Sequence, residues 1–74
     1  MKLYTKTVCP KCLLVKAELT RAGLNPEILN IDQDENAKEA LLSAGFLAVP
    51  VLQIDNEWLH DVPAMLEKVE LMMQ

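Results

Sequence analysis

The segment KLYTKTVCPKCLLVKAELTRA, residues 2–22, establishes how the fold of this 74-residue chain begins. Its first four residues read as a short strand, and a short linker leads from that strand to the CPKC motif at residues 9–12. Pro10 suits the first position of a helix, where its missing N–H costs nothing. Apolar residues then recur at helical spacing, and Gly23 favours the left-handed backbone that ends a helix. The segment therefore predicts a strand over its first four residues and a helix over residues 10–22.

The remaining residues predict a second strand, a second helix, a hairpin and a last helix. Aliphatic side chains favour a largely buried second strand, and the acidic run after it fits the N-terminus of a helix that Gly45 closes. Asp61, as N-cap, and Pro63 are placed to begin the last helix. The predicted bounds are a strand at 27–31, a capping run at Asp32–Glu35, strands at 49–54 and 57–60, and a turn at Asp55-Asn56.

The order βαβαββα predicts a single α/β domain over residues 1–74, since a chain with 51% hydrophobic and 24% charged residues is not a disordered tail. A strand, a helix and a second strand in succession make a right-handed parallel unit, so the first helix begins at the carboxyl end of the first strand. Loops at that edge hold the sites of α/β folds. The CPKC motif is therefore expected where a site belongs.

Charge and hydropathy exclude two classes of partner. The first 24 residues hold five basic side chains and one acidic, whereas the rest of the chain holds two basic and ten acidic, for a net charge of −4. An acidic chain lacks the basic surface on which nucleic-acid affinity depends. No apolar run approaches the roughly 18 residues of a membrane span, and the first residues turn polar too soon for a signal peptide. We expect a cytoplasmic protein that binds neither nucleic acid nor membrane.

Both cysteines lie in the CPKC motif, which favours chemistry over structural cross-linking. A bridge across four residues closes almost no loop in the unfolded chain, so it stabilises little. At the N-cap of the first helix, Cys9 would meet unpaired N–H groups that favour a thiolate, and Lys6 and Lys11 add positive charge. Cys12 follows on the same helical face and is the natural resolving thiol. We therefore interpret the pair as a nucleophile and a resolving thiol in disulfide exchange.

Three other interpretations of the pair stay open at this point. A structural zinc site needs about four Cys or His ligands, and the chain offers only His60 besides the two cysteines. A metal or iron–sulfur centre shared between two copies through Cys9 needs fewer ligands from each. A scaffold domain without activity would keep the fold and ordinary thiols. His60, alone at a strand end, is interpreted as a partly exposed surface residue.

The run from Leu3 to Cys12 and the later Val49-Pro50, in the order βαβαββα, resemble glutaredoxins and the related NrdH-type redoxins. The resemblance implies a thioredoxin-like fold, a four-stranded mixed sheet in the order 2-1-3-4 with the last strand antiparallel, and helices on both faces. It also implies a cis Val49–Pro50 bond beside the cysteines. Main-chain groups of Val49 would then pair with an extended substrate, a form of strand addition.

The departures from the resemblance bear on the reductant. Lys6 lies where glutaredoxins that use glutathione carry a lysine, but Lys11 replaces an aromatic residue, and Leu59-His60-Asp61 replaces a Gly-Gly turn followed by an acid. NrdH-type redoxins are recharged by thioredoxin reductase and supply electrons to ribonucleotide reductase. Trp58 and Pro63 match residues of that group, whereas the four residues between them do not. Trp58 can equally be interpreted as a packing residue of the hairpin.

From these observations we expect a monomeric dithiol–disulfide oxidoreductase. Its expected partners are protein disulfides, with ribonucleotide reductase one of them, and a reductase. The expected cofactor state is no bound metal or organic group, with glutathione or a thioredoxin-reductase system as the external reductant. The catalytic residues would be Cys9 and Cys12. The expected substrate-binding residues are Lys6, Pro10, Lys11, Val49 and Pro50.

Overall fold

The computed structural model describes residues 1–73 and contains seven elements in the predicted order. They are β1 (Lys2–Thr5), α1 (Pro10–Arg21), β2 (Glu27–Asn30), α2 (Glu35–Ser43), β3 (Val51–Ile54), β4 (Glu57–Leu59) and α3 (Val62–Met72). The fold class and the order βαβαββα are therefore confirmed. Gln74, the last residue of the domain predicted from the sequence, lies outside the described residues.

The four strands form one mixed sheet in the order β2-β1-β3-β4, which the resemblance implied. β1 and β2 are parallel, with Thr5 opposite Asn30 at their carboxyl ends. β3 is antiparallel both to β1 and to β4. The last strand is thus antiparallel to its neighbour, as expected of a hairpin, but the strand that runs against the other three is β3.

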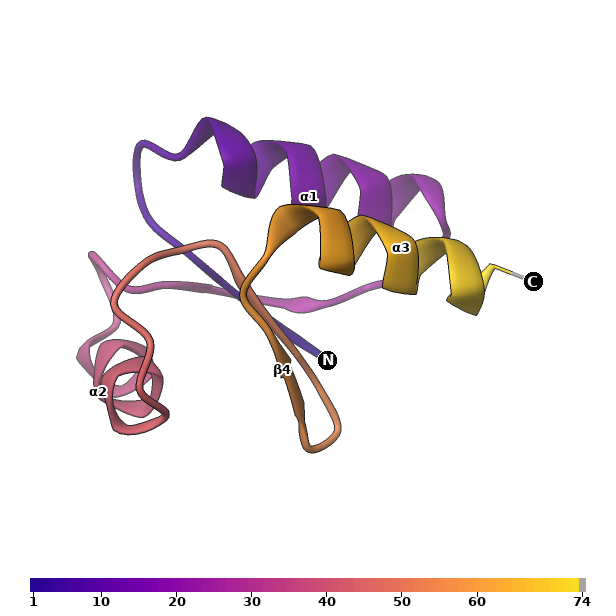
Figure 1. Cartoon of the computed structure of the whole chain (residues 1–74). Helices are drawn as coiled ribbons and strands as arrows, with labels where there is room; N and C mark the ends of the chain where they lie inside the picture. Colours follow the sequence, from indigo (N-terminus) through magenta and orange to yellow (C-terminus); the bar gives the residue numbers. More distant parts are fainter. Residues whose placement is uncertain (74) are drawn as a thin grey trace.

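Helices cover both faces of this sheet (Figure 1). α1 and α3 lie side by side on one face, and α2 lies alone on the other. Successive residues of a strand point to opposite faces, so Leu3 joins the core under α1 and α3, whereas Tyr4 joins the core under α2. The first core is built from Leu3, Val15, Leu19, Leu52, Met65 and Val69. The second is built from Tyr4, Ala37, Leu41 and Val51.

Several strand bounds differ from the sequence prediction. β3 begins at Val51 rather than at residue 49, because Pro50 has no N–H to donate to the ladder. β2 ends at Asn30 and is not largely buried, since it lies at the edge of the sheet and exposes Glu27 and Ile28. β4 ends at Leu59, one residue before the predicted end. Whether a strand lies at the edge of the sheet depends on tertiary structure, and the local sequence of the strand does not indicate it.

The helix ends follow the sequence closely, with one exception. Gly23 and Gly45 adopt positive φ values of 78° and 92° after α1 and α2, as expected of residues that end helices. Asp34 is the N-cap of α2 and accepts a hydrogen bond from the Ala37 N–H over 3.1 Å. Asp61 is the N-cap residue of α3, but its side chain makes no capping hydrogen bond, so the predicted cap is present in position only.

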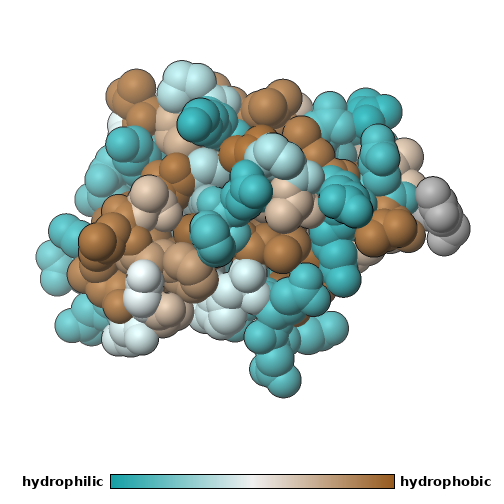
Figure 2. All heavy atoms as spheres, viewed as in Figure 1, coloured by the Kyte–Doolittle hydropathy of each residue, from teal (hydrophilic) through white to brown (hydrophobic). Residues whose placement is uncertain are grey.

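The surface mixes polar and apolar side chains, with apolar ones gathered over α2 and the segment that follows it (Figure 2). Leu47, in that segment, is 89% exposed. Val8, before Cys9, and Leu13, after Cys12, are also exposed apolar residues. None of the helices within residues 1–73 combines the length and the hydropathy that crossing a membrane requires.

Candidate active site

The CPKC motif lies at the beginning of α1, at the carboxyl end of β1. Cys9 is the N-cap residue, with an extended backbone, and Pro10 occupies the first turn of the helix. Cys9 and Cys12 form a disulfide with their Cα atoms 5.2 Å apart. The Cys12 N–H donates a hydrogen bond to Cys9 Sγ over 3.1 Å. The predicted position of Cys9 at the helix start, and of Cys12 within bonding reach, is confirmed.

This arrangement favours negative charge on the first sulfur once the disulfide is reduced. A helix N-terminus presents unpaired N–H groups and the positive end of the helix dipole. The Cys12 N–H already points at Cys9 Sγ, and a hydrogen bond to the charged form of a group favours that form. Both side chains are buried, at 8% exposed for Cys9 and 3% for Cys12. Cys9 is therefore the more accessible of the two.

Val49 lies beside Cys9, and the Val49–Pro50 peptide bond is cis, as the resemblance implied. A hollow of about 300 Å³, the Val49-side hollow, brings these groups together. It is lined by Lys6, Val8, Cys9, Pro10, Lys11 and Val49. Five of the residues predicted from the sequence thus share one surface. Pro50 is buried behind it, directly before β3.

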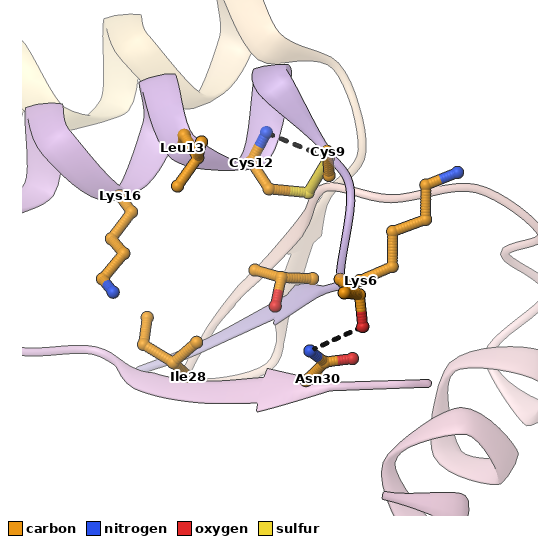
Figure 3. Close-up of a pocket in the computed structure, with 9 residues that line it drawn as sticks. Lys6, Cys9, Cys12, Leu13, Lys16, Ile28 and Asn30 are labelled. Atoms are coloured by element: carbon orange, nitrogen blue, oxygen red, sulfur yellow. Dashed lines mark hydrogen bonds between the residues drawn. A yellow bond between two sulfur atoms is a disulfide. The ribbon is translucent and has the colours of Figure 1, made fainter. Parts of the chain in front are cut away.

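A second hollow, of about 200 Å³, lies on the other side of the disulfide, between α1 and the edge strand β2 (Figure 3). This β2-side hollow is lined by Thr5, Lys6, Thr7, Cys9, Cys12, Leu13, Lys16, Ile28 and Asn30. Lys16, on α1, is one of the two lysines that line it. Its side chain is exposed to solvent.

Asp32 holds the segment that carries Cys9. The Thr7 N–H donates a hydrogen bond to Asp32 Oδ2 over 3.0 Å, and the Asp32 N–H donates to Asn30 Oδ1 over 2.9 Å. The Asn30 Nδ2–H in turn donates to Thr7 Oγ1 over 3.5 Å. The hydrogen bond from the Thr7 N–H is the main cause that holds the pKa of Asp32 below its usual value of 3.8. The Thr7 side chain and the Lys6 charge act in the same direction, whereas burial opposes them.

The prediction that Asp32 belongs to a helix-capping run is wrong for this residue. Asp34 makes the cap, whereas Asp32 bonds to the segment before Cys9. One signal in the sequence could have identified the contact between Thr7 and Asp32. Thr7 and Asp32 each lie two residues beyond Thr5 and Asn30, which pair at the carboxyl ends of parallel strands.

The aromatic residues near the site pack rather than line the cysteines. The Trp58 ring lies 5.6 Å from that of Tyr4 and 5.5 Å from that of Phe46, measured between centroids. Trp58 is therefore a packing residue of the hairpin. His60 is exposed, as predicted, and its ring lies against Phe46. Among residues 1–73, no three His, Cys, Asp or Glu side chains are grouped to hold a metal ion.

Known proteins share this sequence pattern. The glutaredoxin family model matches residues 1–59. The glutaredoxin-like protein NrdH of Escherichia coli strain K12 is 31% identical over 68 residues, which cover 90% of this chain and 84% of the relative. NrdH of Shigella flexneri matches with the same identity and coverage.

Solved structures share the fold. The E. coli glutaredoxin-like protein NrdH-redoxin, described as having a thioredoxin-like activity profile, superposes with a TM-score of 0.80 at 28% identity over 90% of each chain. The thioredoxin-like protein BC3987 superposes with a TM-score of 0.83 at 26% identity, over 92% of this chain and 96% of the other. The thioredoxin-like fold is thereby confirmed, and the adjacent cysteines support thiol–disulfide redox chemistry. The chain belongs to the glutaredoxin family.

Proposed function

We propose that this protein is a dithiol–disulfide oxidoreductase that reduces protein disulfides and acts as an electron carrier. The observation that carries the proposal is the Cys9–Cys12 disulfide at the N-terminus of α1, with the Cys12 N–H bonded to Cys9 Sγ. A bridge this short in sequence stabilises the fold little, so its value lies in opening and closing. Family membership supports the same chemistry.

The proposed cycle has two exchange steps. The Cys9 thiolate attacks one sulfur of a substrate disulfide, and a bond forms between Cys9 and the substrate while the other substrate sulfur leaves as a thiolate and takes up a proton. The Cys12 thiolate then attacks Cys9 Sγ, which forms the Cys9–Cys12 disulfide and releases the second substrate sulfur. Two electrons have passed from the dithiol to the substrate. A reductase that draws on NADPH returns them.

The Val49-side hollow supports substrate binding next to Cys9. Within residues 1–73, neither the N–H nor the C=O of Val49 is bonded to another backbone group. Both are free to pair with an extended segment of a substrate, which would lay its disulfide against Cys9. Lys6 and Lys11 line the same hollow and are exposed, so they would meet acidic groups on the substrate. Pro10 lines the same hollow, and the buried Pro50 follows Val49 directly.

We propose thioredoxin reductase as the electron source and ribonucleotide reductase as a protein substrate. The relatives named NrdH and the thioredoxin-like activity profile of E. coli NrdH-redoxin support this choice. Leu59 and His60 support it too, because they bring side chains to the place where glutathione-dependent members have a Gly-Gly turn. The protein would work as a cytoplasmic monomer without a bound cofactor, and these three points stay predictions.

The test is NADPH oxidation coupled to reduction of a protein disulfide, run with thioredoxin reductase and, separately, with glutathione plus glutathione reductase. Turnover through thioredoxin reductase alone is the expected result. Turnover through glutathione alone would overturn the proposed electron source, and no turnover in either arm would overturn the proposed function. Cys9→Ser should abolish turnover. The absorption spectrum of freshly purified protein tests the alternative of a shared iron–sulfur centre, which would give visible colour.

A further inference from the structure

The two cysteines differ in the hollows that they line. Cys9 lines both the Val49-side hollow and the β2-side hollow, whereas Cys12 lines only the second of these. Cys12 therefore opens to a hollow that meets the Val49-side hollow, where a substrate would bind, only at Lys6 and Cys9. Any group that assists Cys12 without disturbing substrate binding must act from the β2-side hollow.

Cys12 needs such assistance. In the proposed cycle it must lose its proton before it can attack Cys9 Sγ, yet its side chain is 3% exposed. Burial disfavours the charged form of a thiol, because the surroundings solvate a thiolate less well than water does. Cys9, as the N-cap residue, has the helix N-terminus to offset this cost. Cys12 is the third residue of α1, and its own N–H is already donated to Cys9 Sγ.

Lys16 is the cation that is placed to stabilise a Cys12 thiolate. It follows Cys12 by four residues on α1, which puts the two side chains on one helical face about one turn apart. In Figure 3 the Lys16 side chain extends from α1 toward Ile28 on β2, whereas the Lys6 side chain leads away from Lys16. Both lysines line the β2-side hollow, but only Lys16 comes from the helix that carries Cys12.

The other groups around the hollow do not oppose this charge. β1 and the segment after it contribute Thr5 and Thr7, and β2 contributes Ile28 and Asn30, none of which carries charge. No carboxylate of residues 1–73 is among the lining groups. Asp32, in the turn after β2, accepts the hydrogen bond from the Thr7 N–H. Hydroxyl and amide groups on this wall can hold water that carries the Cys12 proton outward.

We propose that Lys16 is a positioning residue for the resolving step, whose ammonium group stabilises the Cys12 thiolate across the β2-side hollow. This inference rests on the proposed role of Cys12 as the resolving thiol. In that step the Cys12 thiolate forms a bond to Cys9 Sγ, and the bond from Cys9 to the substrate breaks. The substrate sulfur leaves with the electron pair and takes up a proton from water. Lys16 keeps its own proton throughout.

The test separates the two exchange steps with an aromatic disulfide, dithiobis-nitrobenzoate, in a stopped-flow instrument. The reduced protein releases one coloured thiolate when Cys9 attacks, at a rate that grows with reagent concentration. It releases a second when Cys12 attacks Cys9, at a rate independent of that concentration. Lys16→Met should move the pH midpoint of the second release upward by about one unit, and slow it about tenfold at neutral pH. The first release should be unchanged.

Two matched variants complete the test. Lys16→Arg, which keeps the charge, should restore the second release, and Arg21→Met, which removes a charge from the far end of the same helix, should leave both releases unchanged. In a Cys9→Ser background, ultraviolet thiolate absorbance titrates Cys12 directly and should show the same shift on Lys16→Met. An unshifted midpoint with Lys16→Met would overturn the inference. Absence of a second release from the unmodified protein would instead overturn the role of Cys12, and with it the proposed function.

Discussion

The Thr7 N–H donates a hydrogen bond to Asp32 Oδ2 over 3.0 Å, and this bond joins the segment before Cys9 to the turn after β2. The two residues are 25 positions apart, yet they follow paired parallel strands by the same number of residues. A side chain on one strand end thereby holds the backbone that leads to the cysteines. The geometry of the helix start depends on a residue outside the CPKC motif.

The first prediction concerns pH. The pKa of Asp32 is lower in the folded chain than its usual 3.8, chiefly because the Thr7 N–H bonds to the carboxylate. A lowered folded pKa contributes stability that is present above the unfolded pKa and lost as pH falls through the folded one. Asp32→Asn should therefore reduce the stability of the fold at neutral pH and flatten its decline below about pH 4. Thermal unfolding between pH 2 and 7 measures this.

Glu39→Gln is the matched control, since Glu39 is an exposed acid on α2 with no side-chain hydrogen bond among the described residues. Its acid profile should follow that of the unmodified protein. An Asp32→Asn profile that superposes on both would show that the Thr7 bond contributes nothing to stability.

The second prediction compares two N-cap residues. Asp34 accepts a hydrogen bond from the Ala37 N–H, whereas the Asp61 side chain makes no capping bond. Asp34→Ala should cost about 1 kcal/mol of unfolding free energy, and Asp61→Ala much less. Urea unfolding of both variants tests the difference. Equal losses would mean that the Asp61 side chain does cap α3 in solution.

The third prediction concerns the attachment of α2, which alone covers its face of the sheet. Leu41 is 2% exposed in the core with Tyr4 and Val51, whereas its neighbour Leu42 is 47% exposed. Leu41→Ala should cost about 2–5 kcal/mol, because it removes buried apolar surface and leaves a cavity. Leu42→Ala should stay within about 0.5 kcal/mol. Similar losses in denaturant unfolding for the two would contradict the assigned orientation of α2.

The fourth prediction concerns the lysines of the Val49-side hollow. Lys6 and Lys11 line it together with Cys9, so they favour negative charge there. Replacing both by Gln should shift thiolate formation at Cys9 to higher pH, as followed by the pH dependence of alkylation. Lys38→Gln, on α2, is the control. A thiolate titration that does not move would show that the helix terminus alone sets the reactivity of Cys9.

Local sequence signals predicted most of the fold. Pro10 and Gly23 fix the two ends of α1 through backbone preferences that need no tertiary contact. The CPKC motif placed Cys9 and Cys12 correctly for the same reason, because the spacing of a helix is local. The cis bond before Pro50 was predicted only from the family resemblance.

The errors over β2 and Asp32 share a tertiary cause. The burial of β2 was predicted from its aliphatic residues, but Ile28 is exposed because β2 lies at the sheet edge. Asp32 was grouped with the capping run because it is near in sequence, whereas its partner Thr7 is near only in space. The β2-side hollow forms where α1 crosses beside β2, so the place of Lys16 on its wall had no local signal.

The central claim, that Cys9 is the nucleophile and Cys12 the resolving thiol, is tested most directly by trapping. The Cys12→Ser variant, mixed with an oxidised protein substrate, should accumulate a covalent complex through Cys9, seen by mass spectrometry and released by a reducing agent. Cys9→Ser should accumulate none under the same conditions. A complex attached through Cys12, or undiminished turnover by Cys9→Ser, would contradict the account.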